Sequence, residues 1–191
     1  MRGQALYARS RQAPASLAAV VISALVVWTL AWIGGGKLTD PRLSTLILVT
    51  GVTAVSAGLG GQDLALERTA AIRWLPRRAA HVLLCGVLVG GVLLAAQALS
   101  GQPASLAFAA RNSAGLMGLV AIGAAWGGAQ YAWLPPFAWL SLSFVVPPTA
   151  DVATQVLGWM LQPPGTTAAT WTALALAAAG TTAYAVAGPR R

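Results

Sequence analysis

Charged residues are scarce in this chain of 191 residues, of which Asp, Glu, Lys and Arg make up only 8%. A soluble domain carries about a quarter of such residues, so this sequence lacks the polar side chains that a water-facing surface needs. Hydrophobic residues reach 57%, and the mean hydropathy is +0.70. The composition therefore predicts an all-α integral membrane protein without a soluble domain of useful size.

Cysteine and histidine occur once each, as Cys85 and His81. A single thiol forms no intrachain disulfide, and the sequence contains no CxxC or His-rich cluster. It also lacks G-x-S-x-G, H-E-x-x-H and carboxylates paired at metal-binding spacing. The run Gly34-Gly35-Gly36-Lys37 lacks the first glycine and the final Ser or Thr of a phosphate loop. We therefore expect no catalysis, metal or cofactor on this chain.

Carboxylates number only four, at Asp40, Asp63, Glu67 and Asp151. All four fall in expected loops, as does every Lys and Arg. Ionisable residues within spans mark proton relays and ion coupling, so ion-driven transport is disfavoured. The net charge of +8 comes from residues at the ends of apolar segments and not from one basic patch, so we expect no nucleic-acid partner.

Apolar segments predict six spans in a single transmembrane domain, residues 1–191. The first run is longer than a signal-peptide core of about 7–15 residues, so we interpret it as a retained span. The fifth is too short to cross alone. Glycines in the fourth predict a helix-packing face. The expected elements are an N-terminal segment (1–14, an interfacial helix or a solvated basic tail), spans at 15–33, 43–59, 81–99, 113–133, 137–147 and 168–187, and an outer amphipathic helix at 149–162.

The basic residues predict the orientation of these spans. With six spans, nine of the twelve Lys and Arg residues fall in segments on the same side as the N-terminus. Basic residues favour the cytoplasmic side. The sequence therefore predicts a multi-pass protein with both termini in the cytoplasm.

The most charged segment of the chain, residues 60–81, lies between the second and third spans. We expect a helix over 62–75 that is stopped by Pro76. Its acidic residues come first and its arginines last, which suits the helix dipole. The alternative is an ordinary basic loop whose arginines set the topology and contact lipid phosphates.

Two phrases, LERTAAIRWLPRRAAH (66–81) and RNSAGLMGLVAIGAAWGGAQYAWLPP (111–136), resemble small permease-like proteins of GC-rich bacteria. The predicted architecture is similar to the membrane subunit of ABC-2-type (type V) exporters. This resemblance implies a bacterial plasma-membrane subunit that pairs with an identical or related permease subunit, contacts membrane lipids and exports an amphiphilic or hydrophobic substrate. It also implies a coupling helix docked on a separate ATPase, which would bind ATP and Mg. The contact candidates are Asp63, Glu67, Arg68, Arg73, Arg77 and Arg78.

The same resemblance implies a substrate path along the first, second and fifth spans. Candidate residues there form an apolar wall with scattered hydroxyls, namely Trp28, Thr29, Thr50, Thr53, Ser56, Trp139, Ser141 and Ser143. Ser and Thr within spans more often bond to their own backbone or to a neighbouring helix. A non-transporting scaffold or sensor subunit remains the alternative function, and a membrane enzyme is a third.

Overall fold

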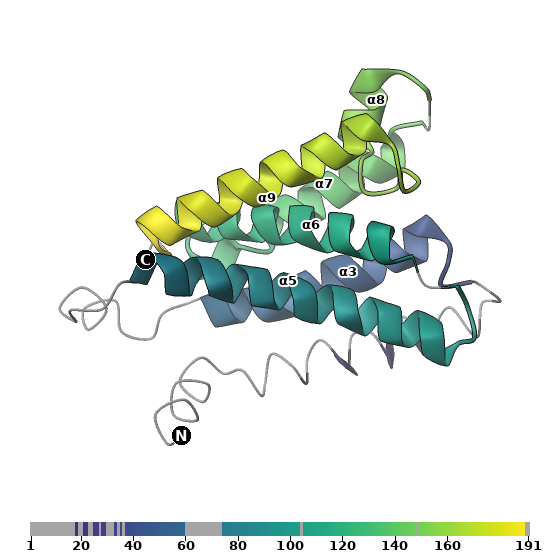
Figure 1. The fold of residues 1–191 in the computed structure, drawn as a ribbon, viewed down its shortest axis with the longest axis horizontal. Coiled ribbons are helices and arrows are strands. Elements are labelled where there is room, and N and C mark those ends of the chain that lie inside the picture. The colour runs from purple at the N-terminus through teal and green to yellow at the C-terminus, as the bar shows by residue number, and fades with distance from the viewer. Residues whose placement is uncertain are drawn as a thin grey trace.

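The computed structural model describes residues 18, 21–22, 25–26, 28–29, 33, 35, 37–59, 74–103, 105–147 and 149–189. This part of the chain is helical and contains no strand, as Figure 1 shows. The expected all-α fold is therefore confirmed for these residues. The helices are α3 (Pro41–Ser56) with the short η1 (Ala57–Leu59), α5 (Trp74–Leu99), α6 (Leu106–Gly127), η2 (Ala129–Tyr131), α7 (Leu134–Val145), α8 (Val152–Leu157) and α9 (Thr167–Ala187).

Three helical stretches in the described part are long and apolar enough to cross a membrane: Pro41–Leu59, Leu75–Leu99 and Leu106–Gly127. They indicate a membrane protein. Helix α7 has 12 residues, fewer than the roughly 20 that a span needs. Helix α9 has 21, but its threonines and aromatic residues lower its hydropathy. The expected first span lies largely outside the described residues, so the count of six remains a prediction.

The long helices run alternately in opposite directions, which gives the bundle two ends (Figure 1). At one end, Gln97 Nε2 donates to Leu38 O at 3.0 Å. At the other, the Tyr184 hydroxyl donates to Leu59 O at 2.7 Å. We call these the Asp40 end (residues 37–41, 97–103, 105–111, 145–147 and 149–167) and the Gly188 end (residues 55–59, 74–81, 127–134 and 184–189).

Helices α6 and α9 form the tightest contact in the bundle, because glycines let their backbones meet. A Cβ added at Gly180 would collide with the carbonyl oxygen of Gly118 on α6. A Cβ at Gly118 would collide with the carbonyl oxygen of Leu176 on α9. Small residues at helix interfaces in membranes permit this approach. Of the glycines expected to form a packing face on the fourth span, Gly115 and Gly118 lie against α9, whereas Gly123 lies against Ala132 and Pro135.

Two helices begin earlier than expected. Ser105 Oγ accepts a hydrogen bond from Phe108 N and caps α6, so this helix begins at Leu106 and not at Ser113. Helix α5 begins at Trp74 and not at His81. It contains Pro76, two residues after Trp74, its first described position. The expected stop at Pro76 is therefore not found.

The hydroxyl of Tyr184 connects α9 to the end of η1 inside the bundle. Tyr184 is 1% exposed, so loss of its hydroxyl would remove a buried hydrogen bond to the Leu59 carbonyl. We expect Tyr184→Phe to lower the free energy of unfolding by about 1–2 kcal/mol. Tyr131→Phe is the matched control, because Tyr131 is 50% exposed. Equal unfolding midpoints for the two variants in detergent would contradict this assignment.

Candidate functional site

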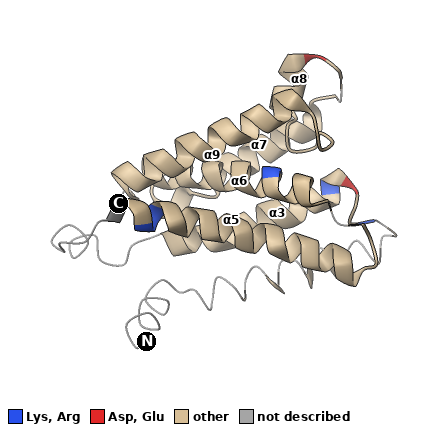
Figure 2. Cartoon of the chain, viewed as in Figure 1, with Lys and Arg blue, Asp and Glu red and all other residues tan. Residues whose placement is uncertain are grey.

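The charged segment begins and ends at the Gly188 end of the bundle. Residues 60–73, with Asp63, Glu67, Arg68 and Arg73, lie outside the described residues. The described chain stops at Leu59 and resumes at Trp74, and both positions are at that end. Figure 2 shows the described Lys and Arg residues toward the two ends of the helices. The segment therefore joins two helices of one bundle at a single end.

Arg77 and Arg78 belong to the last part of this segment, residues 60–81, and lie in the first two turns of α5. Arg77 is exposed and Arg78 is half-buried. The Arg78 guanidinium occupies the space that a side chain at Gly188 would fill, with Nη1 2.7 Å from the position of that Cβ. A positive charge there is favourable, because the C-terminal end of a helix, here α9, carries partial negative charge. Arg78 thus connects the start of α5 to the end of α9.

The structure brings together only two of the eight residues proposed for a substrate path. Trp139 Nε1 and Ser143 Oγ both donate to Leu157 O, at 2.9 and 3.1 Å. Trp28 Nε1 donates to Ser100 Oγ at 2.9 Å. The other five hydroxyls each donate to a carbonyl three or four residues earlier in the chain, those of Thr29, Thr50, Thr53, Ser56 and Ser141.

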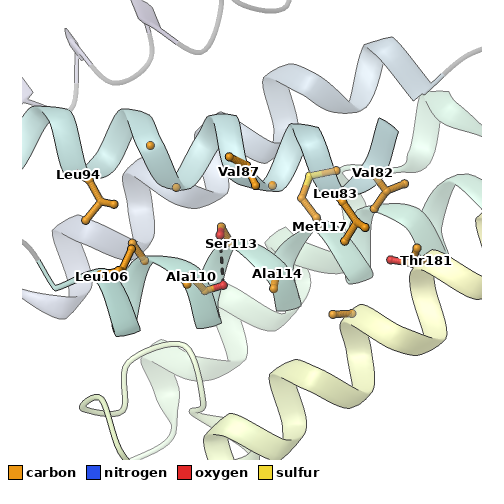
Figure 3. Close-up of a pocket in the computed structure, with 15 residues that line it drawn as sticks. Val82, Leu83, Val87, Leu94, Leu106, Ala110, Ser113, Ala114, Met117 and Thr181 are labelled. Atoms are coloured by element: carbon orange, nitrogen blue, oxygen red, sulfur yellow. Dashed lines mark hydrogen bonds between the residues drawn. The ribbon is translucent and has the colours of Figure 1, made fainter. Parts of the chain in front are cut away.

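A groove of about 340 Å³ runs between α5, α6 and α9 and includes none of those eight residues. Its lining is apolar, apart from the hydroxyls of Ser113 and Thr181, and the Ser113 hydroxyl donates to Ala110 O at 3.3 Å. Figure 3 shows the lining side chains of the three helices. The groove is hollow because small residues form much of it: Gly86, Gly90, Gly91, Ala109, Ala110, Ala114 and Ala177. No pattern in the sequence predicts this groove, because it depends on α5 and α9 lying side by side.

A buried polar cluster lies at the Asp40 end. Arg111 is 9% exposed, and its Nη2 and Nη1 donate to Gln162 O at 2.6 Å and Pro163 O at 3.0 Å. Its Nε donates to Asn112 Oδ1 at 2.9 Å. Asn112 Nδ2 donates in turn to Met160 O at 2.7 Å. The cluster fastens the loop between α8 and α9 to α6.

Sequence reasoning placed Arg111 in a loop, and this is wrong because Arg111 lies within α6. The Arg111 guanidinium donates to backbone carbonyls of a loop that is distant in the sequence. No acidic residue near Arg111 in the sequence therefore indicates that its side chain is buried. Ser105 was the available signal, because serine is a favoured residue at helix N-caps. The cluster has no acidic member and contains no nucleophile or metal ligand set. Its chemistry is that of a structural clamp.

Comparisons with protein families, with curated proteins and with solved structures find no match to this chain. The described residues also contain no group of three or more His, Cys, Asp or Glu side chains that could hold a metal ion. For the residues that the structure describes, the class is an all-helical membrane protein with three helices long and apolar enough to cross a bilayer.

Proposed function

We propose that this chain is the membrane subunit of an ATP-driven ABC exporter, coupled through residues 62–78 to a separate ATPase subunit. One observation carries the proposal. Leu59, at the end of η1, and Trp74, at the start of α5, lie at the same end of the bundle. The charged segment between them therefore connects α3 to α5 at that end. These two helices pack against each other. A force applied to the segment by a partner would act on both helices at once.

Contacts at the Gly188 end supply a physical route for this coupling. Arg78 lies against the end of α9, and Tyr184 of α9 donates to Leu59 O at the end of η1. A displacement of the first turn of α5 would therefore reach α9 and α3. In the proposed assembly, Asp63, Glu67, Arg68, Arg73, Arg77 and Arg78 contact the ATPase, which holds ATP and Mg.

We propose an amphiphilic or hydrophobic substrate that passes where this chain meets a second permease subunit, identical or related. The hydroxyls along the proposed path support this choice, because most of them already bond to their own helix and leave an apolar wall. The orientation proposed from the charges puts the Gly188 end in the bacterial cytoplasm. Helix α8 then lies outside the plasma membrane.

A charge-reversal experiment tests the coupling. The chain is co-expressed with an ATPase encoded beside it, and ATP-driven movement of a fluorescent phospholipid analogue is measured in inverted membrane vesicles. We expect the double variant Glu67→Arg with Arg73→Glu to reduce transport to the level without ATP, because both docking charges change sign. Arg42→Glu reverses an exposed charge at the Asp40 end and should leave transport unchanged.

Transport that persists in the double variant would contradict the coupling role. An ATPase that binds the chain without any ATP-driven movement would instead favour the alternative function, a scaffold or sensor subunit.

A further inference from the structure

We infer that the turn between α6 and α7, residues 126–134, lies in the interfacial layer of the bilayer, where its aromatic side chains contact lipid headgroups. The partner is therefore the phospholipid surface at the Gly188 end of the bundle. This inference rests on the membrane class of the chain and on the turn itself. It does not depend on the proposed export function.

Three aromatic side chains of this turn are exposed: Trp126 by 74%, Tyr131 by 50% and Trp133 by 40%. The Trp133 ring donates from Nε1 to Gln130 O at 3.0 Å. Trp126 Nε1 and the Tyr131 hydroxyl bond to no other described residue. Each of these side chains combines a large apolar ring with a polar tip. Such side chains are enriched where an apolar layer meets water.

The length of α6 puts the turn at the edge of the hydrocarbon. Helix α6 has 22 residues and is apolar enough to cross a membrane, and a rise of 1.5 Å per residue gives about 33 Å. The hydrocarbon core of a bilayer is roughly 30 Å thick. A helix that only just crosses this core has its last residues at the boundary. Trp126 is the last residue but one of α6, so its ring lies at that boundary.

The turn and its neighbours in the sequence carry no charge. The chain has no Lys, Arg, Asp or Glu between Arg111 and Asp151, and the exposed polar side chain of the turn is the amide of Gln130. A polar rim surrounds most protein–protein interfaces, and this turn supplies little of one. Exposed rings beside a single amide therefore favour the interfacial layer over bulk water and over a second protein.

The turn also lies beside the start of the charged segment, because η2 packs against η1. Leu59, the last residue of η1, is the last described residue before that segment. A membrane boundary that passes through the turn therefore lies at the level of Leu59. The charged segment then starts at the membrane surface and not within the hydrocarbon, where charge is costly.

Electron paramagnetic resonance of a spin label measures the depth of the turn in the full chain, without a partner protein. Cys85 is the only cysteine, so a single new cysteine can be labelled on a Cys85→Ala background. Gln130→Cys carries the label in the turn and leaves every aromatic residue in place. Collisions with oxygen, which dissolves in hydrocarbon, are compared with collisions with a water-soluble nickel complex. Spin-labelled lipids calibrate the depth in phosphatidylcholine vesicles.

We expect the label at position 130 to collide with both reagents at the rates of a lipid that is labelled next to its headgroup. Leu84→Cys is the matched control. Leu84 is 68% exposed and lies about 14 Å along α5 from Leu75, the start of a spanning stretch, which is near the middle of a bilayer. The label at position 84 should therefore collide almost only with oxygen.

The role of the aromatic rings is tested by membrane thickness. Side chains at the interface anchor a protein against a change of depth when the hydrocarbon thickens. In vesicles with longer acyl chains, the label at position 130 should keep its depth below the headgroups, whereas in Trp126→Leu with Trp133→Leu it should move into the hydrocarbon. Phe137→Leu is the control at the same end and should keep the depth, because Phe137 is 47% exposed but has no polar tip.

Three results at position 130 would overturn the inference: collisions with oxygen as dominant as at position 84, collisions with the nickel complex as frequent as for a label in water, or few collisions with either reagent. They would place the turn in the hydrocarbon, in bulk water or against a second protein. An equal depth in the double variant and in Phe137→Leu would overturn the anchoring role of the rings.

Discussion

Gly180→Ala is expected to destabilise the fold by about 3 kcal/mol, whereas Gly91→Ala is expected to leave stability nearly unchanged. Both substitutions add one methyl group to a helical glycine. At Gly180 the new Cβ would collide with the carbonyl oxygen of Gly118, and backbone cannot rotate away as a side chain can. At Gly91 the new Cβ meets nothing within 4 Å.

The collision at Gly180 forces α9 away from α6 along their shared interface. Overpacking of a well-packed interior costs about 1–3 kcal/mol and sometimes more, and we expect the upper part of this range because backbone meets backbone. The measurement is the fraction of monodisperse protein after detergent extraction, followed by the thermal unfolding midpoint. Equal midpoints for the two variants would contradict the close approach of α6 and α9.

Arg111→Met is expected to release the loop between α8 and α9 and to destabilise the protein by about 3 kcal/mol. The substitution keeps an apolar stem but removes every donor that Arg111 contributes to the clamp, while Asn112 Nδ2 still donates to Met160 O. The half-buried Gln162 carbonyl then loses its donor, and the Pro163 carbonyl keeps only its bonds from Thr166 N and Oγ1. Arg111→Lys should restore stability only in part, because one ammonium group cannot reproduce the planar fork that bonds to both carbonyls and to Asn112.

Hydrogen exchange of residues 158–166 measures this release directly. We expect faster exchange there in Arg111→Met, with exchange in the middle of α5 close to that of the unmodified protein. Arg42→Gln removes an exposed arginine at the same end and should alter neither region. Unchanged exchange of the loop in Arg111→Met would show that the guanidinium does not fasten it.

The helical fold was accessible from the sequence because long apolar runs separated by Gly and Pro identify helices directly. The helix starts were harder to place. In an apolar chain a charged residue usually indicates a loop, which predicts a loop at Arg111. Arg111 instead lies in α6, because its guanidinium donates to backbone carbonyls about 50 residues later in the sequence. Pro76 was assigned as a stop, although proline fits equally well in a first helical turn.

The groove and the clamp were not accessible, because both depend on which helices are neighbours. Nothing local to Gly86, Gly90 or Gly91 distinguishes glycines that line a slot from glycines that face another helix. Gly118 illustrates the other outcome, because the backbone of α9 occupies the space that a side chain at Gly118 would fill. Side-chain size could be read from the sequence, but the partner of each small residue could not.

A position-specific crosslink tests the central proposal most directly. A photoreactive amino acid is placed at Glu67 in the charged segment and, as the control, at Ala150 beside α8 near the Asp40 end, in cells that also express a candidate ABC ATPase. The proposed exporter predicts a crosslink to the ATPase from position 67 and none from position 150. A failure to crosslink the ATPase from position 67, or an equal yield from the two positions, would contradict the coupling of this segment to an ATP-binding partner.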